Sequence, residues 1–284
     1  MSWSGASNRK DLESRLRRVG GQSDDEIDIA QAALLLAALD RPQVSLERYY
    51  HHLSLLERDT AELAARQGAE KDLATRIAVL NQVLVQRYSY QGDRADYDDL
   101  NNANLMRVID RRRGLPVALG ILYLHAARAQ GWSICGLGFP GHFMLRLDLG
   151  SARAIVDPFN DGAVHDAAAL RGLVKTMAGS EAELRPEHTA TVGNRDILLR
   201  LQNNIKLRLI QQERSGEALE ILETMLMFAP QRAALWKEAG ILHSHLDNMR
   251  AAIMAFEHYL ELAGPEPERQ SIAALLQQLR SQLN

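Results

Sequence analysis

The chain has 284 residues, of which 46% are hydrophobic and 24% charged, and its formal net charge is −3. This composition is typical of a globular protein and excludes a mainly disordered or low-complexity chain. The near-neutral charge provides no overall basic field, so we expect neither nucleic acid nor a membrane surface as a partner. The single cysteine excludes an internal disulfide, a zinc finger and a cysteine-ligated cluster and fits a reducing compartment, so we expect a cytoplasmic location. We also expect no cofactor.

The N-terminus, residues 1–22, is rich in arginine and contains no apolar run that could form the core of a signal peptide. We expect it to be a flexible arm or a frayed helix. The longest apolar stretch, residues 30–39, is about half of the roughly 20 residues that a membrane span needs. The sequence therefore predicts no membrane span.

Helical periodicity dominates the first third of the chain. Ser23 and Glu26 have the spacing of a capping box, which predicts a helix start there. Pro42 interrupts the pattern, and a second helix is predicted from about Ser45. A third helix is predicted through residues 73–84.

The middle third mixes helix and strand. Residues 88–104 are polar and rich in Asp, Asn and Tyr, which predicts a long ordered loop. Two helices are predicted after it, at 105–112 and at 115–130, the second with Pro116 in its first turn, where the missing N–H costs nothing. Three short β-like runs follow, at residues 133–137, 143–149 and 154–156.

The chain returns to helical periodicity after about residue 187, and the helical tail has an internal repeat. Ala218 and Leu222 are matched 34 residues later by Ala252 and Phe256, which is the period of tetratricopeptide repeats. Helix breaks are predicted at Ser215–Gly216, Pro230, Asp247–Asn248 and Gly264–Pro265.

The first helix of the earlier repeat departs from the pattern. Gln202 and Lys206 stand where the later repeat has Trp236 and Gly240, as a degenerate capping repeat would have. The alternative is an ordinary helical bundle whose spacing is coincidental.

A histidine and an aspartate in the middle third could carry chemistry. His142 begins one predicted strand and Asp157 ends the next, so the two side chains can meet across antiparallel strands. Asp157 would then orient the imidazole and leave its other nitrogen as a base. The structural alternative is that His142 packs beside a turn and Asp157 caps a strand end before Pro158.

These segments resemble a known family. A core helix from near Gly114 to Gly131, a strand, a His-Phe strand start and a Val-Asp-Pro ending resemble the transglutaminase-like superfamily. With the segment Gly-Phe-Pro-Gly-His-Phe at 138–143 and the repeats behind it, the chain is more narrowly similar to the bacterial SirB-one family. The resemblance spans residues 24–284 and implies an α+β fold, with a small antiparallel sheet in a cysteine-protease-related core at 23–187. An all-α tetratricopeptide-type tail at 188–284 would follow.

The resemblance places Pro116 at the position of the nucleophilic cysteine. Neither Val117 nor Ala118 beside it offers a nucleophile, whereas His142 and Asp157 match the other two catalytic positions. Loss of the nucleophile from such a unit costs about 10⁶-fold in rate. The resemblance therefore implies the fold and a vestigial triad rather than acyl transfer.

Other candidates have a less specific pattern. Arg111, Arg112 and Arg113 could hold a phosphate or carboxylate, but we favour pairing with the acids of the preceding loop, Asp93, Asp96, Asp98 and Asp99. We expect Cys135 to be a small buried hydrophobe, because a helix C-terminus raises a thiol pKa. The pairs His51–His52 and His243–His245 lack the spacing that puts two imidazoles on one helix face, so we expect no metal site.

The favoured hypothesis is an interaction or regulatory module that presents a groove to an unknown protein or peptide. Groove residues would come from the tail; the candidates are Asn203, Asn204, Lys206 and Arg208. In this hypothesis His142 and Asp157 hold strands in register, and the loop from Tyr88 to Leu100 packs over the old cleft. The alternative is an amide or peptide hydrolase or transferase that uses His142 and Asp157 without the usual cysteine. A third hypothesis, suggested by the family name, is an indirect regulator of transcription or virulence.

Overall fold

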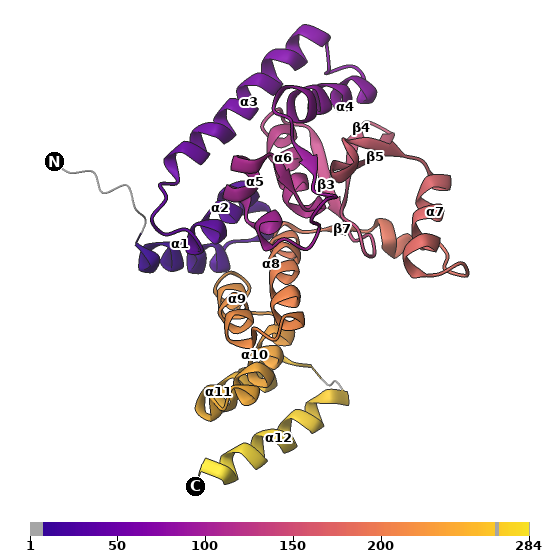
Figure 1. Cartoon of the computed structure of the whole chain (residues 1–284). Helices are drawn as coiled ribbons and strands as arrows, with labels where there is room; N and C mark the ends of the chain where they lie inside the picture. Colours follow the sequence, from indigo (N-terminus) through magenta and orange to yellow (C-terminus); the bar gives the residue numbers. More distant parts are fainter. Residues whose placement is uncertain (1–7, 265–266, 284) are drawn as a thin grey trace, which may run out of the picture. The chain divides into compact units, whose positions relative to one another are not determined.

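The computed structural model describes residues 8–264 and 267–283 of the chain (Figure 1). By its internal contacts the chain forms two compact units. The first contains residues 23–201 and the start of helix α1 (Arg9–Gly21) up to Leu12, and the second contains residues 13–22 and the chain after Leu201. The division thus falls later than the boundary expected after residue 187.

Helix α1 corresponds to the helical alternative for the N-terminal segment, of which residues 1–7 lie outside the described residues. Residues 9–21 form a regular helix in which Leu12 and Leu16 are fully buried. These two leucines are one helical turn apart, so they lie on the same face of the helix and bury it. No helix within the described parts of the chain combines the length and the apolarity needed to cross a bilayer.

The first third is helical, as the periodicity predicts. Its elements are the 3₁₀ turn η1 (Asp24–Glu26), α2 (Ile29–Leu39), α3 (Glu47–Gln67), α4 (Leu73–Asn81) and a π-helical turn η2 (Gln82–Arg87). The Ser23–Glu26 capping box forms, but it caps η1. Because Ile27 is extended, α2 starts later, with Asp28 accepting a hydrogen bond from Gln31 N at 3.0 Å.

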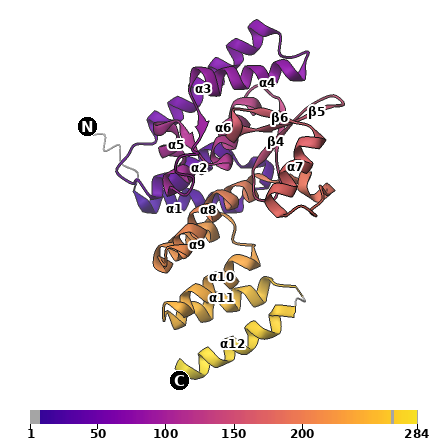
Figure 2. The same cartoon turned by 45° about the vertical axis from the view of Figure 1, so that its right-hand side comes forward.

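Helix α6 (Pro116–Arg128) is the central helix of the first unit, and it is buried along most of its length. Before it come β1 (Gln91–Gly92), the 3₁₀ turn η3 (Leu100–Ala103), α5 (Leu105–Arg111) and β2 (Arg113–Gly114); β1 and β2 pair in parallel. A Cβ atom at Gly120 would lie 2.4 Å from the Phe143 ring. Glycine therefore allows α6 to lie against the start of the sheet (Figure 2).

A five-stranded antiparallel sheet lies beside α6. Its order is β6 (Ala163–His165), β5 (Ala152–Asp157), β4 (Met144–Leu149), β3 (Ser133–Leu137) and β7 (Thr191–Val192). The predicted runs correspond to β3, β4 and β5. Strands β6 and β7 were not predicted because they are too short to show alternation. Helix α7 (Ala167–Ala178) follows β6, and the 3₁₀ turns η4 (Pro158–Asn160) and η5 (Pro186–Thr189) complete the unit.

The tail is a succession of helices. They are α8 (Asn194–Gln211), α9 (Ser215–Phe228), α10 (Ala233–His245), α11 (Met249–Leu262) and α12 (Pro267–Leu283), with the unit boundary at Leu201 within α8. The breaks at Pro230, Asp247–Asn248 and Gly264 fall where they were predicted, and Pro265 lies outside the described residues. Ser215 and Gly216 are instead the first residues of α9, and that break lies at residues 212–214. A Cβ atom at Gly240 would lie 2.4 Å from the Phe256 ring, so glycine permits the close packing of α10 on α11. The fold is thus a mostly helical α+β domain followed by tetratricopeptide-type helices.

Candidate functional site

The N-terminus of α6 is the position at which the resemblance places a nucleophile. Leu115 is the N-cap residue and Pro116 is the first residue of the helix. Pro116 is buried, and its neighbours Leu115, Val117 and Ala118 are at most 1% exposed. This helix start therefore carries only apolar side chains and no group that could attack a substrate.

His142 and Asp157 meet, as their strand positions predict. His142 follows a turn in which Gly141 has a φ of +68°, and Asp157 is the last residue of β5. His142 Nε2 lies 2.8 Å from Asp157 Oδ2, with His142 9% exposed and Asp157 fully buried. The pair has the geometry of a carboxylate that orients an imidazole.

Asp157 accepts further hydrogen bonds from the turn that follows it. Its Oδ1 accepts from the backbone N–H groups of Phe159 at 3.0 Å and Asn160 at 3.3 Å, and its Oδ2 accepts from Asn160 Nδ2 at 2.6 Å. Burial raises the pKa of Asp157, but the hydrogen bond and charge of His142 and the bonds from the η4 turn outweigh it and lower the pKa overall. The carboxylate is therefore a structural cap of η4 as well as a partner of His142.

A second histidine, which the sequence analysis missed, lies beside the pair. His165 Nε2 is 3.4 Å from Asp157 Oδ2, and among the described residues it has no hydrogen-bond partner. His165 ends β6, where it is in register with Ile155 of β5. Because the three-residue β6 shows no alternation, the sequence did not reveal that this histidine reaches the same carboxylate.

Residues of the loop after Tyr88 contact the η4 turn. Arg94 Nη2 donates to Asn160 Oδ1 at 2.6 Å, and the Tyr97 ring lies edge-on to Phe159 at 5.7 Å between centroids. Phe159 in turn lies edge-on to His142 at 6.1 Å. The loop therefore packs on the η4 turn, which in turn contacts His142.

Arg200 of α8, also missed by the sequence analysis, holds the turn that precedes His142. Its guanidinium donates to the carbonyl oxygens of Phe139 at 3.2 Å and His142 at 2.6 Å, and it lies 5.5 Å from the centre of the Phe143 ring. The two ends of this interaction are too far apart in sequence for any local pattern to connect them.

Arg111 follows the ion-pairing interpretation of the arginine run. Its Nη2 lies 3.1 Å from Asp93 Oδ2 and its Nη1 lies 2.8 Å from Asp99 Oδ2. Asp93 is 3% exposed. Arg111, the last residue of α5, therefore holds the loop between Tyr88 and Leu100 against that helix.

Arg112 and Arg113 do not join this ion-pair network. Arg112 lies 2.9 Å from His52 Nε2 and 4.9 Å from the centre of the Tyr90 ring, whereas Arg113 is exposed. Burial lowers the pKa of His52 to about 4, and the charge of Arg112 acts in the same direction. The three guanidinium groups thus do not converge on one anion, and within the described residues no three His, Cys, Asp or Glu side chains are placed to hold a metal.

The structure corrects two of the four tail candidates. Lys206 is 3% exposed and forms an ion pair with Glu238, because it occupies the interior position that corresponds to Gly240. Arg208 is 8% exposed and donates to Asn204 O at 2.9 Å. Neither cation lies on a groove surface, and Asn203 and Asn204 are half-buried.

Cys135 is half-buried in β3, and its Sγ lies 3.8 Å from Arg146 O. Burial raises the pKa of its thiol, so the thiolate is disfavoured at neutral pH. The only cysteine of the chain therefore offers no activated nucleophile near Pro116.

Comparisons with known proteins agree with this architecture. Residues 48–203 match the transglutaminase-like superfamily and residues 205–280 match the tetratricopeptide repeat. A UPF0162 protein of Vibrio cholerae is 30% identical over 86% of this chain and 89% of its own length. A second UPF0162 protein, from Xylella fastidiosa, is 27% identical over 84% and 85%.

One further relative matches a smaller share of the chain. An F-box only protein 21 of Pongo abelii is 26% identical over 66% of this chain and 31% of its own length. No solved structure matched the chain. The match over more than half of the chain, with relatives that it covers almost end to end, shows that the protein belongs to the transglutaminase-like superfamily, together with the UPF0162 proteins.

Proposed function

We propose that this protein is a non-catalytic interaction or regulatory module of the SirB-one group that acts in the cytoplasm and binds a protein or peptide partner through its helical tail. The observation that carries the proposal is a row of apolar side chains at equivalent positions of the repeat, two of which are exposed. We call Leu207, Ile241 and Leu275 the apolar stripe. They lie at intervals of 34 residues, on α8, α10 and α12.

Two of the three side chains of the stripe are exposed, although the residues beside them are buried. Leu207 is 54% and Ile241 is 49% exposed, and Leu275 is partly buried. The residues beside the first two, Lys206 and Gly240, are buried. Exposed large apolar residues that recur in register are typical of a binding surface.

Two ion pairs support the continuity of the stripe. Lys206 of α8 pairs with Glu238 of α10, and Lys237 of α10 pairs with Glu268 of α12. The three helices are therefore neighbours within the second unit. A partner would therefore meet the stripe with apolar side chains of its own.

Affinity isolation from native lysate tests the proposal, with the bound proteins quantified by mass spectrometry. Truncation after residue 187 would remove Ile197 and Leu198, which are buried in the first unit, so surface substitutions are the better test. The test variant is the double substitution Leu207→Glu and Ile241→Glu. The matched control is Met254→Glu, at a 60% exposed position on α11 outside the stripe.

We expect a reproducible partner that the wild type and Met254→Glu retain and that the double variant loses by at least about tenfold, since each tenfold requires only about 1.4 kcal/mol. Equal capture by the double variant and the wild type would overturn the proposal.

A hydrolase or transferase that uses His142 and Asp157 without the usual cysteine is the second candidate function. The observation that favours it is the 2.8 Å hydrogen bond between the two side chains. His142 would activate water, since no nucleophile lies at Pro116. Turnover of a mixed peptide substrate by the wild type, with loss in His142→Gln, would support this function; equal background rates in both proteins would exclude it.

A further inference from the structure

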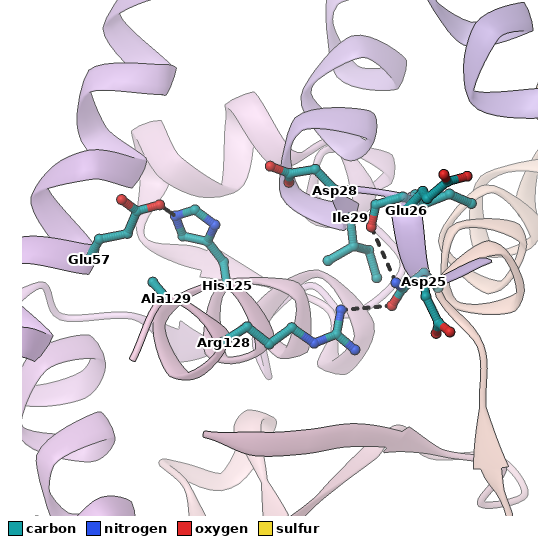
Figure 3. A pocket seen from close by; sticks show the side chains of 10 residues that line it. Asp25, Glu26, Asp28, Ile29, Glu57, His125, Arg128 and Ala129 are labelled. Carbon is teal, nitrogen blue, oxygen red and sulfur yellow. Dashed lines mark hydrogen bonds and ion pairs between the residues drawn. The ribbon is translucent and has the colours of Figure 1, made fainter. Parts of the chain in front are cut away.

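The first unit contains a cavity at the end of α6 opposite to Pro116. Its volume is about 550 Å³, within the roughly 300–1,000 Å³ range of small-molecule sites. The walls come from the segment Asp25–Ile29, from α3, from the last turn of α6 and from the start of α8. Figure 3 shows the lining side chains.

Asn194 makes one wall of the cavity rigid. Its Nδ2 donates to the carbonyl oxygens of Asp24 at 3.0 Å and Ile27 at 3.2 Å, and its backbone N–H donates to Asp24 Oδ2 at 2.7 Å. Asn194 is 7% exposed. A Cβ atom at Gly193 would lie 2.5 Å from Asp24 Oδ2, so glycine permits this close contact. The wall is therefore formed before any ligand arrives, which lowers the entropic cost of binding.

Arg128 places a cation inside the cavity without a direct counter-ion. Its Nη1 donates to Asn194 Oδ1 at 2.8 Å (Figure 3), and among the described residues it forms no ion pair. Burial lowers the pKa of Arg128, while the more distant charges of Asp25 and Asp28 act in the opposite direction. A guanidinium has five N–H donors, so Arg128 keeps donors that a ligand carboxylate could occupy.

Carboxylates also line the cavity. Glu26 accepts a hydrogen bond from Ser23 at 2.8 Å, and Asp28 accepts one from Gln31. Glu57 Oε1 lies 3.1 Å from His125 Nε2, as Figure 3 shows. Asp25 is exposed and, within the described chain, makes no hydrogen bond or ion pair. Together with Arg128, these four carboxylates give the lining a formal charge of −3 when His125 is neutral.

We propose that this cavity binds a basic amino acid or a short basic peptide. The ligand carboxylate would meet Arg128, and its ammonium groups would meet Asp25 and Asp28. A zwitterion alone would satisfy the two signs of charge, and the excess of carboxylates selects a ligand with an additional cation. This site is separate from the apolar stripe and from His142, so the inference does not depend on the proposed function.

Isothermal titration calorimetry on the full chain tests the inference with three probes. L-lysine carries both kinds of group, cadaverine carries only the two ammonium groups, and glutarate carries only carboxylates. We expect L-lysine to bind at least about tenfold more tightly than either of the other two, because only L-lysine carries both a carboxylate for Arg128 and ammonium groups for the carboxylates. Equal affinity of L-lysine and cadaverine, or no heat from L-lysine at millimolar concentration, would overturn the proposal.

Substitutions locate the site. Arg128→Gln should remove the preference for L-lysine over cadaverine, and the matched control Arg113→Gln, at an exposed position, should leave it unchanged. Because Arg128 also holds Asn194, Asp25→Asn provides a second variant at a side chain with no structural contact to lose. Asp25→Asn should weaken L-lysine binding several-fold, and unchanged binding in both test variants would place the ligand elsewhere.

Discussion

The His142–Asp157 site and the apolar stripe are opposite kinds of surface. In the first, polar side chains are buried and satisfied by one another: Asp157 is fully buried and accepts from His142 and from the η4 turn. In the second, apolar side chains are exposed, with Leu207 and Ile241 about half accessible. A buried polar group and an exposed apolar patch are both departures from the usual pattern, so both require an explanation.

The comparison sets a buried polar pair against the surface that we propose binds a partner. His142 and Asp157 form a hydrogen bond, the start of α6 carries only apolar side chains, and Asp157 also accepts hydrogen bonds from the η4 turn. Leu207 and Ile241 of the stripe are exposed, Leu275 is partly buried, and the three positions recur with the 34-residue period of the tail. The four predictions below test this contrast, from the largest expected effect on stability to the smallest.

The first prediction concerns Asp157. Asp157→Ala leaves His142 and the η4 donors without an acceptor, and we expect the free energy of unfolding to fall by about 3–5 kcal/mol. Urea denaturation measures the change. Glu183→Ala, at an exposed position of the same unit, should change stability by no more than about 0.5 kcal/mol. A loss below about 1 kcal/mol for Asp157→Ala would contradict a structural role.

The second prediction concerns pH. The pKa of His52 is about 4 in the folded protein, against 6.5 for an ordinary histidine. Between these values the unfolded chain is protonated and the folded chain is not, so stability is complete above pH 6.5 and is lost as the pH falls towards 4. We expect a loss of roughly 3 kcal/mol over this window. His52→Gln should flatten the profile, and an unchanged slope would show that another group is responsible.

The third prediction concerns the tail. A side chain at Gly240 would meet the Phe256 ring, so Gly240→Val should destabilise the second unit by about 1–3 kcal/mol. Hydrogen exchange should show faster exchange in α10 and α11. At Gly216 a Cβ atom meets nothing within 4 Å, so Gly216→Ala should cause no loss. Equal protection in Gly240→Val and wild type would refute the proposed close packing.

The smallest stability effect is expected at the stripe. Leu207→Glu combined with Ile241→Glu should change the melting temperature little, because surface substitutions usually cost no more than about 0.5 kcal/mol. Differential scanning calorimetry checks this expectation. A drop comparable to that of Gly240→Val would mean that the stripe supports the fold, and the contrast with the core would disappear.

Much of the fold could be predicted because its signals are local. The period of the tail, Pro116 in the first turn of α6 and the three longer strands are all visible within short windows. The pairing of His142 with Asp157 was also predictable, because their strands are adjacent in sequence. Misplaced starts, such as that of α2, arose where a capping box served a 3₁₀ turn instead.

The rest of the candidate site depends on contacts between distant segments. His165 reaches Asp157 through a strand too short to show a pattern, and Arg200 holds a turn 58 residues earlier in the chain. Lys206 was predicted to face a groove, but its repeat position faces inward. Leu207 and Ile241 are 34 residues apart, so the period of the repeat could have shown that they occupy equivalent positions.

The measurement that tests the central claim most directly compares partner capture by three folded proteins at equal concentration: the wild type, His142→Gln, and the double variant Leu207→Glu with Ile241→Glu. Our account predicts that His142→Gln retains the partner and that the double variant loses it by at least about tenfold. Retention by the double variant, with loss in His142→Gln, would contradict the account and identify the His142–Asp157 site as the working surface.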